Sequence, residues 1–410
     1  MELIRSISLV NTPALIVIYA IALLTTLVAA WGFFRAPLRR RTTIALIIAL
    51  ILGAIAWFIL AVWPKPFPET IPPEIYIAGT AAAFVLVSAF TQRGRRVLLA
   101  ILAVIAMGNA YLVANLQYQQ FPTVGSFDPT PVTVSMNLDE FNAATQPPQI
   151  DGREVGALVT VPLPPMRDAV AYVPPAYWHN SNLPVLVLMA GNPGEPGQWF
   201  TVGQGSQTAD DFQSQHGGES PVIISVDATG TFSGNPACVD GPEYQVQTYL
   251  SQTVPAAINQ TFNVNPDQSK WTIGGLSYGG TCALQVVTNH PQAYGMFLDF
   301  SGQAEPSIGS HKKTVDAFFG GDEQAFADVN PANLLRKAVG TNEYSHLKGI
   351  FIAGDRDTES MNALATMNQL AQAAGMTTTY STVPGGHSYS VWRQALRQSF
   401  EEVAQFGGIQ

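Results

Sequence analysis

The chain contains few charged residues and few cysteines. Asp, Glu, Lys and Arg make up 12% of its 410 residues, with 20 Lys or Arg against 29 Asp or Glu, and cysteine occurs twice. Two cysteines are too few for a small scaffold held by several disulfides, so the chain must fold around a buried core. The acidic balance offers no basic surface that would attract nucleic acid, and we expect no nucleic-acid partner.

Basic residues are scarcest in the later part of the chain. Residues 1–118 hold nine Lys or Arg and three Asp or Glu, whereas residues 119–410 hold 11 and 26. The later part therefore cannot hold anionic lipid by charge. If it lies close to a membrane, the earlier part must keep it there.

Long hydrophobic runs are confined to the first 118 residues. Four of them approach the roughly 20 residues that a helix needs to span a bilayer, at about Pro13 to Phe34, Thr42 to Trp63, Ile75 to Phe90 and Val97 to Gln117. We therefore expect a transmembrane domain of four helices over residues 1–118. No small-residue cleavage site follows the first run, which argues against a cleaved signal peptide.

Positive charge in the loops predicts the orientation of these helices. The first and third loops hold seven arginines, namely Arg35, Arg39, Arg40, Arg41, Arg93, Arg95 and Arg96. Loops rich in Lys and Arg stay in the cytoplasm. The sequence therefore predicts a multi-pass protein of the cell membrane whose two termini, and everything after residue 118, lie outside.

The rest of the chain divides into a short linker and one domain. Residues 119–150 are rich in Pro, Thr, Gln and Asn without clear periodicity, which predicts an extended linker or an entry segment lying over the catalytic domain. Residues 151–410 alternate short apolar strands with helical stretches, as a mostly parallel, doubly wound α/β sheet requires. The strands are expected at about Val155 to Val161, Ala169 to Val173, Val185 to Met189, Val222 to Val226, Trp271 to Ile273, Met296 to Asp299, Ile350 to Ala353 and Thr378 to Thr382.

A candidate nucleophile lies between one of these strands and a helix. The run Gly274 to Gly280 reads Gly-Gly-Leu-Ser-Tyr-Gly-Gly, and it places Ser277 between two glycines at a sharp strand-to-helix turn. Glycine permits such a turn, and the turn exposes the serine hydroxyl. The pattern favours Ser277 as a catalytic nucleophile, although a glycine-rich turn without function has the same appearance.

A serine nucleophile needs an imidazole and a carboxylate. His387 is the preferred imidazole among six histidines, because it lies late in the chain, in a glycine-rich loop between a strand and an amphipathic helix. The acid should follow the strand that ends near Ala353. In many such hydrolases the acid lies three residues after the strand-ending glycine, which favours Asp357, with Asp355 as the alternative and Glu359 third.

The same chemistry requires two backbone N–H donors for a developing oxyanion. The residue after the nucleophile, Tyr278, should supply one donor. The loop after the strand Val185 to Met189 should supply the other, from Asn192 or, as the alternative, Gly191. Pro193 has no N–H.

Both cysteines, Cys238 and Cys282, fall in the predicted exterior domain, where a disulfide can persist. We favour their pairing, which would pin the segment after the Asp227 strand to the helix that begins at Ser277. The alternative is that both are small buried apolar residues.

Four segments together resemble a known family. They are Tyr172 to Tyr177, Leu186 to Gly191, Gly274 to Gly280 and Gly385 to Trp392. On these segments, residues 154–405 resemble the Putative esterase family, which includes esterase D, enterochelin esterases and mycolyltransferases, all α/β-hydrolases. The chain departs from the mycolyltransferase pattern in three respects. It has a membrane anchor, its expected acid is an aspartate rather than a glutamate, and Tyr278 follows the serine.

This resemblance implies a covalent acyl-serine route at Ser277 without a metal or cofactor. We expect a membrane-anchored serine esterase that hydrolyses acyl or aminoacyl esters of cell-envelope lipids or glycolipids. The composition, rich in Ala and poor in Lys, also resembles that of an actinobacterial envelope enzyme. One alternative is an acyltransferase, which differs only in the second nucleophile. Another is a protein without catalysis that binds envelope lipid or a partner.

Overall fold

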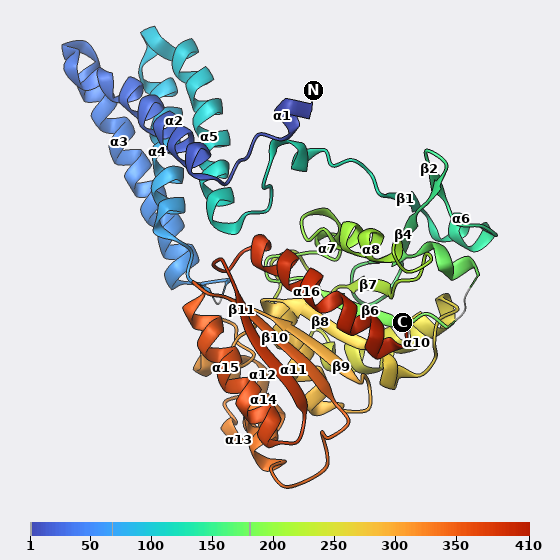
Figure 1. The fold of residues 1–410 in the computed structure, drawn as a ribbon. Coiled ribbons are helices and arrows are strands. Elements are labelled where there is room, and N and C mark those ends of the chain that lie inside the picture. The colour runs from blue at the N-terminus through green and yellow to red at the C-terminus, as the bar shows by residue number, and fades with distance from the viewer. Residues whose placement is uncertain (1, 68, 180–181) are drawn as a thin grey trace. The chain divides into compact units, whose positions relative to one another are not determined.

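The computed structural model describes residues 2–67, 69–179 and 182–410. The chain divides into two compact units, Met1–Pro129 and Thr130–Gln410. The first unit is helical and the second contains a large sheet (Figure 1).

Within its described residues, the first unit has four helices that are long and apolar enough to cross a membrane, which confirms the four predicted hydrophobic helices. Their helical segments are α2 (Thr12–Ala30), α3 (Ala36–Trp57), α4 (Pro73–Thr91) and α5 (Arg96–Tyr118), extended by short turns at Trp31–Phe34, Phe58–Val62 and Arg93–Arg95; α1 (Glu2–Arg5) and a turn at Val124–Phe127 flank them. The buried positions are mostly alanines, including Ala29, Ala45, Ala82 and Ala103, so the helix backbones can approach closely.

A buried glutamine joins the helix ends near the arginine-rich loops. Gln92 is fully buried, and its Nε2 donates to the carbonyl of Ala29 at 3.1 Å and to Oγ1 of Thr42 at 3.2 Å. Arg95 in turn donates to Gln92 Oε1 at 3.2 Å and to the Val28 carbonyl at 2.6 Å. These bonds satisfy polar groups that lipid could not, and they place the first and third loops at the same end of the unit.

The described part of the second unit is built on a nine-stranded sheet of order β1-β4-β5-β7-β6-β8-β9-β10-β11. The strands are β1 (Thr133–Met136), β4 (Gly156–Val161), β5 (Ala169–Val173), β6 (Val185–Met189), β7 (Val222–Val226), β8 (Thr272–Leu276), β9 (Met296–Phe300), β10 (Lys348–Gly354) and β11 (Thr377–Val383). Only β5 runs antiparallel to its neighbours, β4 and β7. The predicted mostly parallel α/β sheet is confirmed.

Residues 119–150, predicted as a linker or entry segment, contain regular secondary structure. Residues 133–136 form β1, which pairs in parallel with β4, and α6 (Leu138–Ala143) follows directly. Asn137 caps α6 by accepting from the Glu140 amide at 2.8 Å. A hairpin of β2 (Gln149–Ile150) and β3 (Arg153–Glu154) completes the segment. The alternation of Val132, Val134 and Met136 carried the strand signal, but four residues are too few to stand out from a Pro-rich background.

Helices cover both faces of the sheet (Figure 1). On β9, the Asp299 side chain faces Gly280 of α11, and the next residue, Phe300, packs on Trp199 of α7 with ring centroids 6.4 Å apart. Successive strand residues face opposite sides, so α7 and α11 lie on different faces. The helices are α7 (Gln198–Thr201), α8 (Gly205–Gln213), α9 (Val246–Thr248), α10 (Val254–Thr261), α11 (Tyr278–Asn289), α12 (His311–Phe319), α13 (Glu323–Val329), α14 (Pro331–Lys337), α15 (Thr358–Ala373) and α16 (Tyr389–Gly407), with short turns at Pro175–Trp178, Tyr249–Thr253 and Gln268–Lys270.

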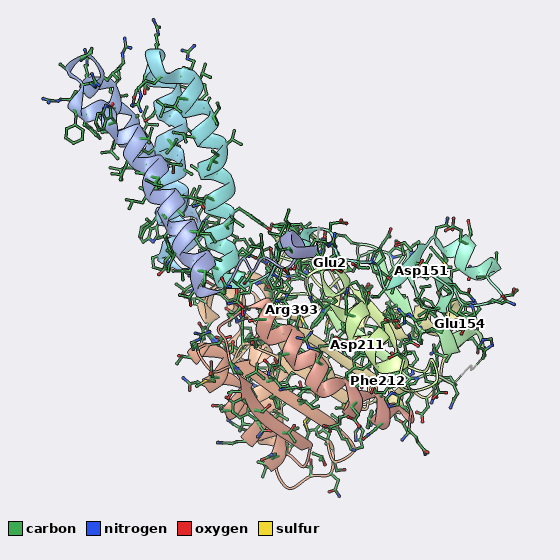
Figure 2. The ribbon with its side chains drawn as sticks, turned by 45° about the horizontal axis from the view of Figure 1, so that its top comes forward. Glu2, Asp151, Glu154, Asp211, Phe212 and Arg393 are labelled. Carbon is green, nitrogen blue, oxygen red and sulfur yellow. A yellow bond between two sulfur atoms is a disulfide. The ribbon has the colours of Figure 1, made fainter. Side chains whose placement is uncertain are left out.

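The last helix fixes the loop that precedes it. Phe400 of α16 packs edge-on against Phe212 of α8, at 5.4 Å between centroids. Arg393, one turn into α16, is buried and donates to the Val202 carbonyl at 2.8 Å; Phe212 and Arg393 are both labelled in Figure 2. These contacts hold the N-terminus of α16, and the 385–388 loop before it, against the sheet.

Candidate active site

The turn between β8 and α11 has the strained geometry of a nucleophile elbow. Ser277 has φ +53° and ψ −119°, a region that side-chain-bearing residues seldom adopt. Its amide donates to the Phe300 carbonyl at 2.7 Å, which fixes the turn against β9. A Cβ on Gly275 would lie 2.7 Å from Cα of Gly279, and a Cβ on Gly279 would overlap the Met189 carbonyl. Both glycines of the motif are therefore required by close backbone approach.

The structure brings Ser277, His387 and Asp357 into one hydrogen-bonded chain. The Ser277 Oγ lies 3.0 Å from His387 Nε2, and His387 Nδ1 lies 2.7 Å from Asp357 Oδ2. The three residues come from the ends of β8, β11 and β10, and 110 positions separate the serine from the histidine. Ser277 is 3% exposed, so little of its surface faces solvent.

Asp357 is held ready as an ionised partner. Burial raises the pKa of its carboxyl, but hydrogen bonds from His387 and Ser360, together with the charge of His387, lower it by more, so the pKa is lowered overall. Asp357 also caps α15, because its Oδ1 accepts from the Ser360 amide at 3.3 Å. The carboxylate therefore stays charged at neutral pH and fixes the imidazole orientation.

The other two candidate acids have different surroundings. Asp355 accepts from the Gly385 amide at 2.9 Å and thereby braces the loop that carries His387. Glu359 is an exposed residue in the first turn of α15. The structure thus brings Asp357 to His387 and gives Asp355 a bracing contact.

The predicted oxyanion loop lies against the nucleophile. A Cβ on Gly191 would lie 3.3 Å from Cβ of Ser277. Asn192 is 7% exposed, and its Nδ2 donates to the Gly234 carbonyl at 2.9 Å. The amide of Tyr278 belongs to the first turn of α11, where amides have no partner within the helix. The two predicted sources of N–H donors therefore flank Ser277.

An ion pair that the sequence analysis missed supports this loop. Arg167 binds the buried carboxylate of Asp227 through Nε and Nη2, at 2.9 and 2.8 Å, and donates to the Gly194 carbonyl at 3.0 Å. Burial raises the pKa of Asp227, but the hydrogen bonds from Arg167 lower it by more. The pKa is therefore lowered overall. Asp227 follows β7 at the carboxyl edge of the sheet. Ligand sites gather at this edge of a parallel sheet, so the position of Asp227 was the one sequence signal for a role near the active site.

We expect Arg167→Met to impair turnover as well as stability. The substitution removes the cation that pairs with the buried Asp227 carboxylate, which costs about 3 to 5 kcal/mol of folding free energy. It also removes the hydrogen bond to the Gly194 carbonyl. We expect kcat to fall about 100-fold with little change in KM, because a small displacement of a transition-state donor is enough to slow the reaction. Arg153→Met is the matched control, since Arg153 makes a two-point pair with Asp210 at 2.9 and 3.0 Å away from this loop. Equal losses of kcat in the two variants would contradict the bracing role.

The two cysteines form a disulfide, as predicted. Cys238 and Cys282 are joined with their Cα atoms 5.3 Å apart, and both are fully buried. The Cys238 amide also donates to the Tyr278 hydroxyl at 3.2 Å, and that hydroxyl donates to the Ala228 carbonyl at 2.9 Å. The disulfide and the tyrosine therefore fasten the 228–238 loop to the first turns of α11.

Removal of this disulfide is expected to destabilise the protein. The bond joins residues 44 positions apart, and the chain-entropy model gives about 4 kcal/mol for such a loop. We expect the Cys238→Ala/Cys282→Ala variant to unfold at a midpoint lower by several degrees in a thermal scan. An unchanged midpoint, with wild-type protein shown by thiol titration to be oxidised, would contradict this expectation.

A buried carboxyl that takes no part in the hydrogen-bonded chain lies behind the elbow. Asp299 is fully buried against Gly280 and accepts from the Gly302 amide at 2.9 Å. Burial raises its pKa to about 8. In the unfolded chain the group loses its proton near pH 4, so folding stability falls as pH rises from about 4 to 8. We expect Asp299→Asn to remove this dependence, and its melting temperature relative to wild type should rise between pH 5 and pH 8.

Across the residues that the structure describes, no group of three or more His, Cys, Asp or Glu side chains is arranged to hold a metal ion. Segment 301–346 holds α12, α13 and α14, and His311 bridges Glu305 and Glu323 there at 2.9 and 2.8 Å.

Fold and comparisons agree on the class of protein. The mostly parallel sheet with a strained serine after β8 is that of an α/β-hydrolase. The chain belongs to the Putative esterase family, whose model matches residues 165–403. An uncharacterized protein of Corynebacterium glutamicum is 52% identical over 421 residues that cover 99% of each chain, so the match includes the hydrophobic helices.

Solved structures are similar to part of this chain. A ferulic acid esterase aligns with a TM-score of 0.51 at 19% identity, over 59% of this chain and 92% of its own. An S-formylglutathione hydrolase from Agrobacterium tumefaciens aligns with a TM-score of 0.49 at 18% identity, over 59% and 90%. At such identities, the likeness to the ferulic acid esterase shows the fold alone.

Proposed function

We propose that this protein is a membrane-anchored serine esterase with its catalytic domain outside the membrane. Ser277 acts as the nucleophile, His387 as the general base and Asp357 as the acid of a triad. The observation that carries the proposal is the chain of contacts from Ser277 Oγ through His387 to Asp357, at 3.0 and 2.7 Å, on a serine with φ +53°.

The geometry supports a two-step acyl transfer. His387 Nε2 takes the proton of Ser277 as Oγ attacks the ester carbonyl, and Asp357 stabilises the imidazolium that forms. The amides of Tyr278 and Asn192 stabilise the oxyanion. The alcohol leaves with the proton from His387, and an acyl-serine remains. Water then attacks the acyl group while giving a proton to His387, which returns it to Ser277 as the acid product departs.

The first unit supports a proposal for the substrate class. Four helices capable of crossing a membrane, with arginine-rich loops at one end, would keep the second unit beside the bilayer. An amphiphilic ester is concentrated at that surface. We therefore propose acyl or aminoacyl esters of cell-envelope lipids or glycolipids as substrates.

A fluorophosphonate probe tests the catalytic proposal. Full-length protein in detergent should be labelled covalently, and Ser277→Ala should lose the label. Ser345→Ala, at an exposed serine remote in sequence from the elbow, should keep it. A folded wild-type protein that takes no label would favour the non-catalytic alternative.

Two further measurements test location and substrate. A protease added to intact spheroplasts should cleave the second unit, and protection of that unit would contradict the exterior location. A deletion strain and a Ser277→Ala strain should accumulate the same ester, as measured by lipid profiling. If an added alcohol acceptor captures the acyl group faster than water does, the reaction is transfer instead of hydrolysis.

A further inference from the structure

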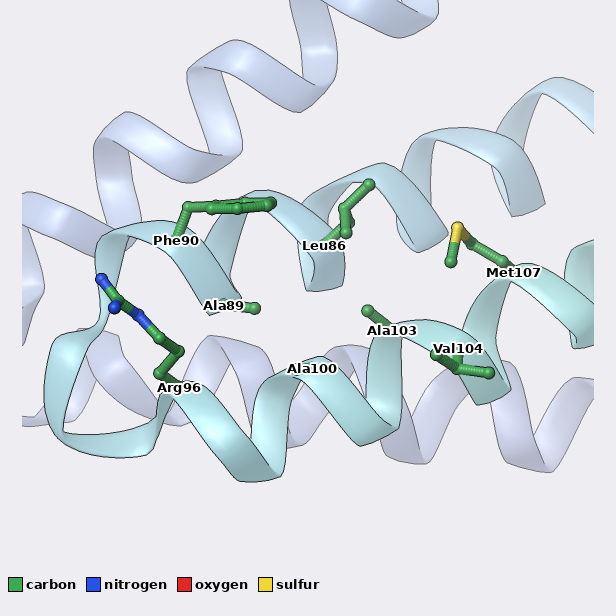
Figure 3. A pocket seen from close by; sticks show the side chains of 8 residues that line it. All are labelled: Leu86, Ala89, Phe90, Arg96, Ala100, Ala103, Val104 and Met107. Atoms are coloured by element: carbon green, nitrogen blue, oxygen red, sulfur yellow. The ribbon is translucent and has the colours of Figure 1, made fainter.

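A groove of about 460 Å³ runs along the first unit between α4 and α5 (Figure 3). Its floor consists of two small buried side chains, Ala89 and Ala103, which are 4% and 1% exposed. Exposed apolar side chains, including Phe90, Val104 and Met107, form its rims. The side chains of the floor are small and those of the rims are large. The groove is therefore deep enough to hold a chain of methylene groups.

One end of the groove carries a positive charge. Arg96, the first residue of α5, is the charged residue of its lining, and Figure 3 shows its side chain at the end next to Phe90. Neighbouring Arg95 instead donates to Gln92 and to the Val28 carbonyl inside the unit. Arg96 is exposed, so its guanidinium can reach a ligand that occupies the groove.

The length of the groove matches one leaflet of a bilayer. Its lining on α5 extends from Arg96 to Met107, and the rise between these two residues is about 16 Å at 1.5 Å per residue. The hydrocarbon core of a bilayer is about 30 Å thick, so one leaflet accounts for about half of that. A guanidinium at the headgroup level and an apolar channel of leaflet depth fit the two parts of a phospholipid.

We propose that this groove binds one acyl chain of an anionic phospholipid, whose headgroup phosphate pairs with Arg96. The headgroup is anionic because seven arginines and no acidic residue occupy the two loops at this end, so a zwitterionic lipid would gain less there. Guanidinium groups also bind phosphate oxygens in pairs. The site rests on the membrane location proposed above and is independent of the chemistry at Ser277.

Native mass spectrometry of the full-length protein tests this site. Protein in detergent is titrated with phosphatidylglycerol and, separately, with phosphatidylcholine of the same acyl chains. We expect one tightly bound phosphatidylglycerol, with phosphatidylcholine weaker by about fivefold or more. Arg96→Gln should remove that difference. Arg40→Gln is the matched control, because it removes one exposed arginine of the same basic end outside the groove.

A second variant tests the groove without changing charge. Ala100 lines the groove and is exposed, so Ala100→Phe should fill it and weaken both lipids without disturbing helix packing. Fluorophosphonate labelling and the melting temperature check that each variant is folded. Equal affinity for the two lipids, an equal loss in Arg40→Gln and Arg96→Gln, or full binding by folded Ala100→Phe would each overturn the proposal. If Ala100→Phe does not fold, the arginine pair decides it.

Discussion

Ser277→Ala and His387→Ala should each reduce ester hydrolysis by about 10⁶-fold, and the double variant should be no slower than either single one. Without the hydroxyl there is no covalent route for the imidazole to assist. Without the imidazole, 3.0 Å from Oγ, the hydroxyl remains protonated at neutral pH. The measurement is kcat with a chromogenic short-chain ester, using full-length protein in detergent.

The non-additivity is the sharper part of this expectation. Groups that act as one unit lose nearly the whole effect when either is removed. Two separate losses that multiply in the double variant would show that Ser277 and His387 act independently, and the triad would then be wrong. The Ser345→Ala variant should retain wild-type kcat.

Asp357→Asn should lower kcat by about 10⁴-fold, whereas Asp355→Asn should change it by less than about tenfold. An amide at position 357 would donate to His387 Nδ1 and favour the wrong tautomer, although the 2.7 Å contact could still form. Asp355 bonds the Gly385 amide instead, so its replacement loosens the loop and leaves the tautomer unchanged. The reverse order of effects would assign the acid to Asp355.

The pH profile provides an independent check on Asp357. Its carboxyl has a lowered pKa, so it stays ionised as pH falls below the ordinary range for aspartate. The stability from its contact with His387 is present above the unfolded pKa and is lost as pH falls through the folded pKa. Asp357→Asn should therefore be less sensitive to acid unfolding than wild type, measured as melting temperature between pH 5 and pH 3.

Local sequence was sufficient where the chemistry depends on neighbouring residues. Gly275 is required by its close contact with Gly279, and Gly279 by its close contact with Met189. Such contacts exclude side chains, so the glycines can be recognised in the sequence. The hydrophobic helices were equally readable, because a span in lipid needs a continuous apolar run. In contrast, β1 is a four-residue strand at the edge of the sheet. Its strand conformation is stabilised by pairing with β4 rather than by its own sequence.

Contacts between distant residues were not readable. Nothing local distinguishes Arg167 from other arginines, and its role appears only when β7 brings Asp227 beside Gly194. The choice between Asp355 and Asp357 depended on the direction of two side chains in one turn.

The sequence by itself determined the four hydrophobic helices, the α/β class and the sharp turn at Ser277, because apolar runs, strand periodicity and a glycine-flanked turn are local properties. Only the tertiary structure decided which carboxylate reaches the imidazole, what braces the loop beside the serine, and where a groove opens between α4 and α5. The reason is physical: these features depend on distances between residues far apart in the chain, and the packing of the core sets those distances.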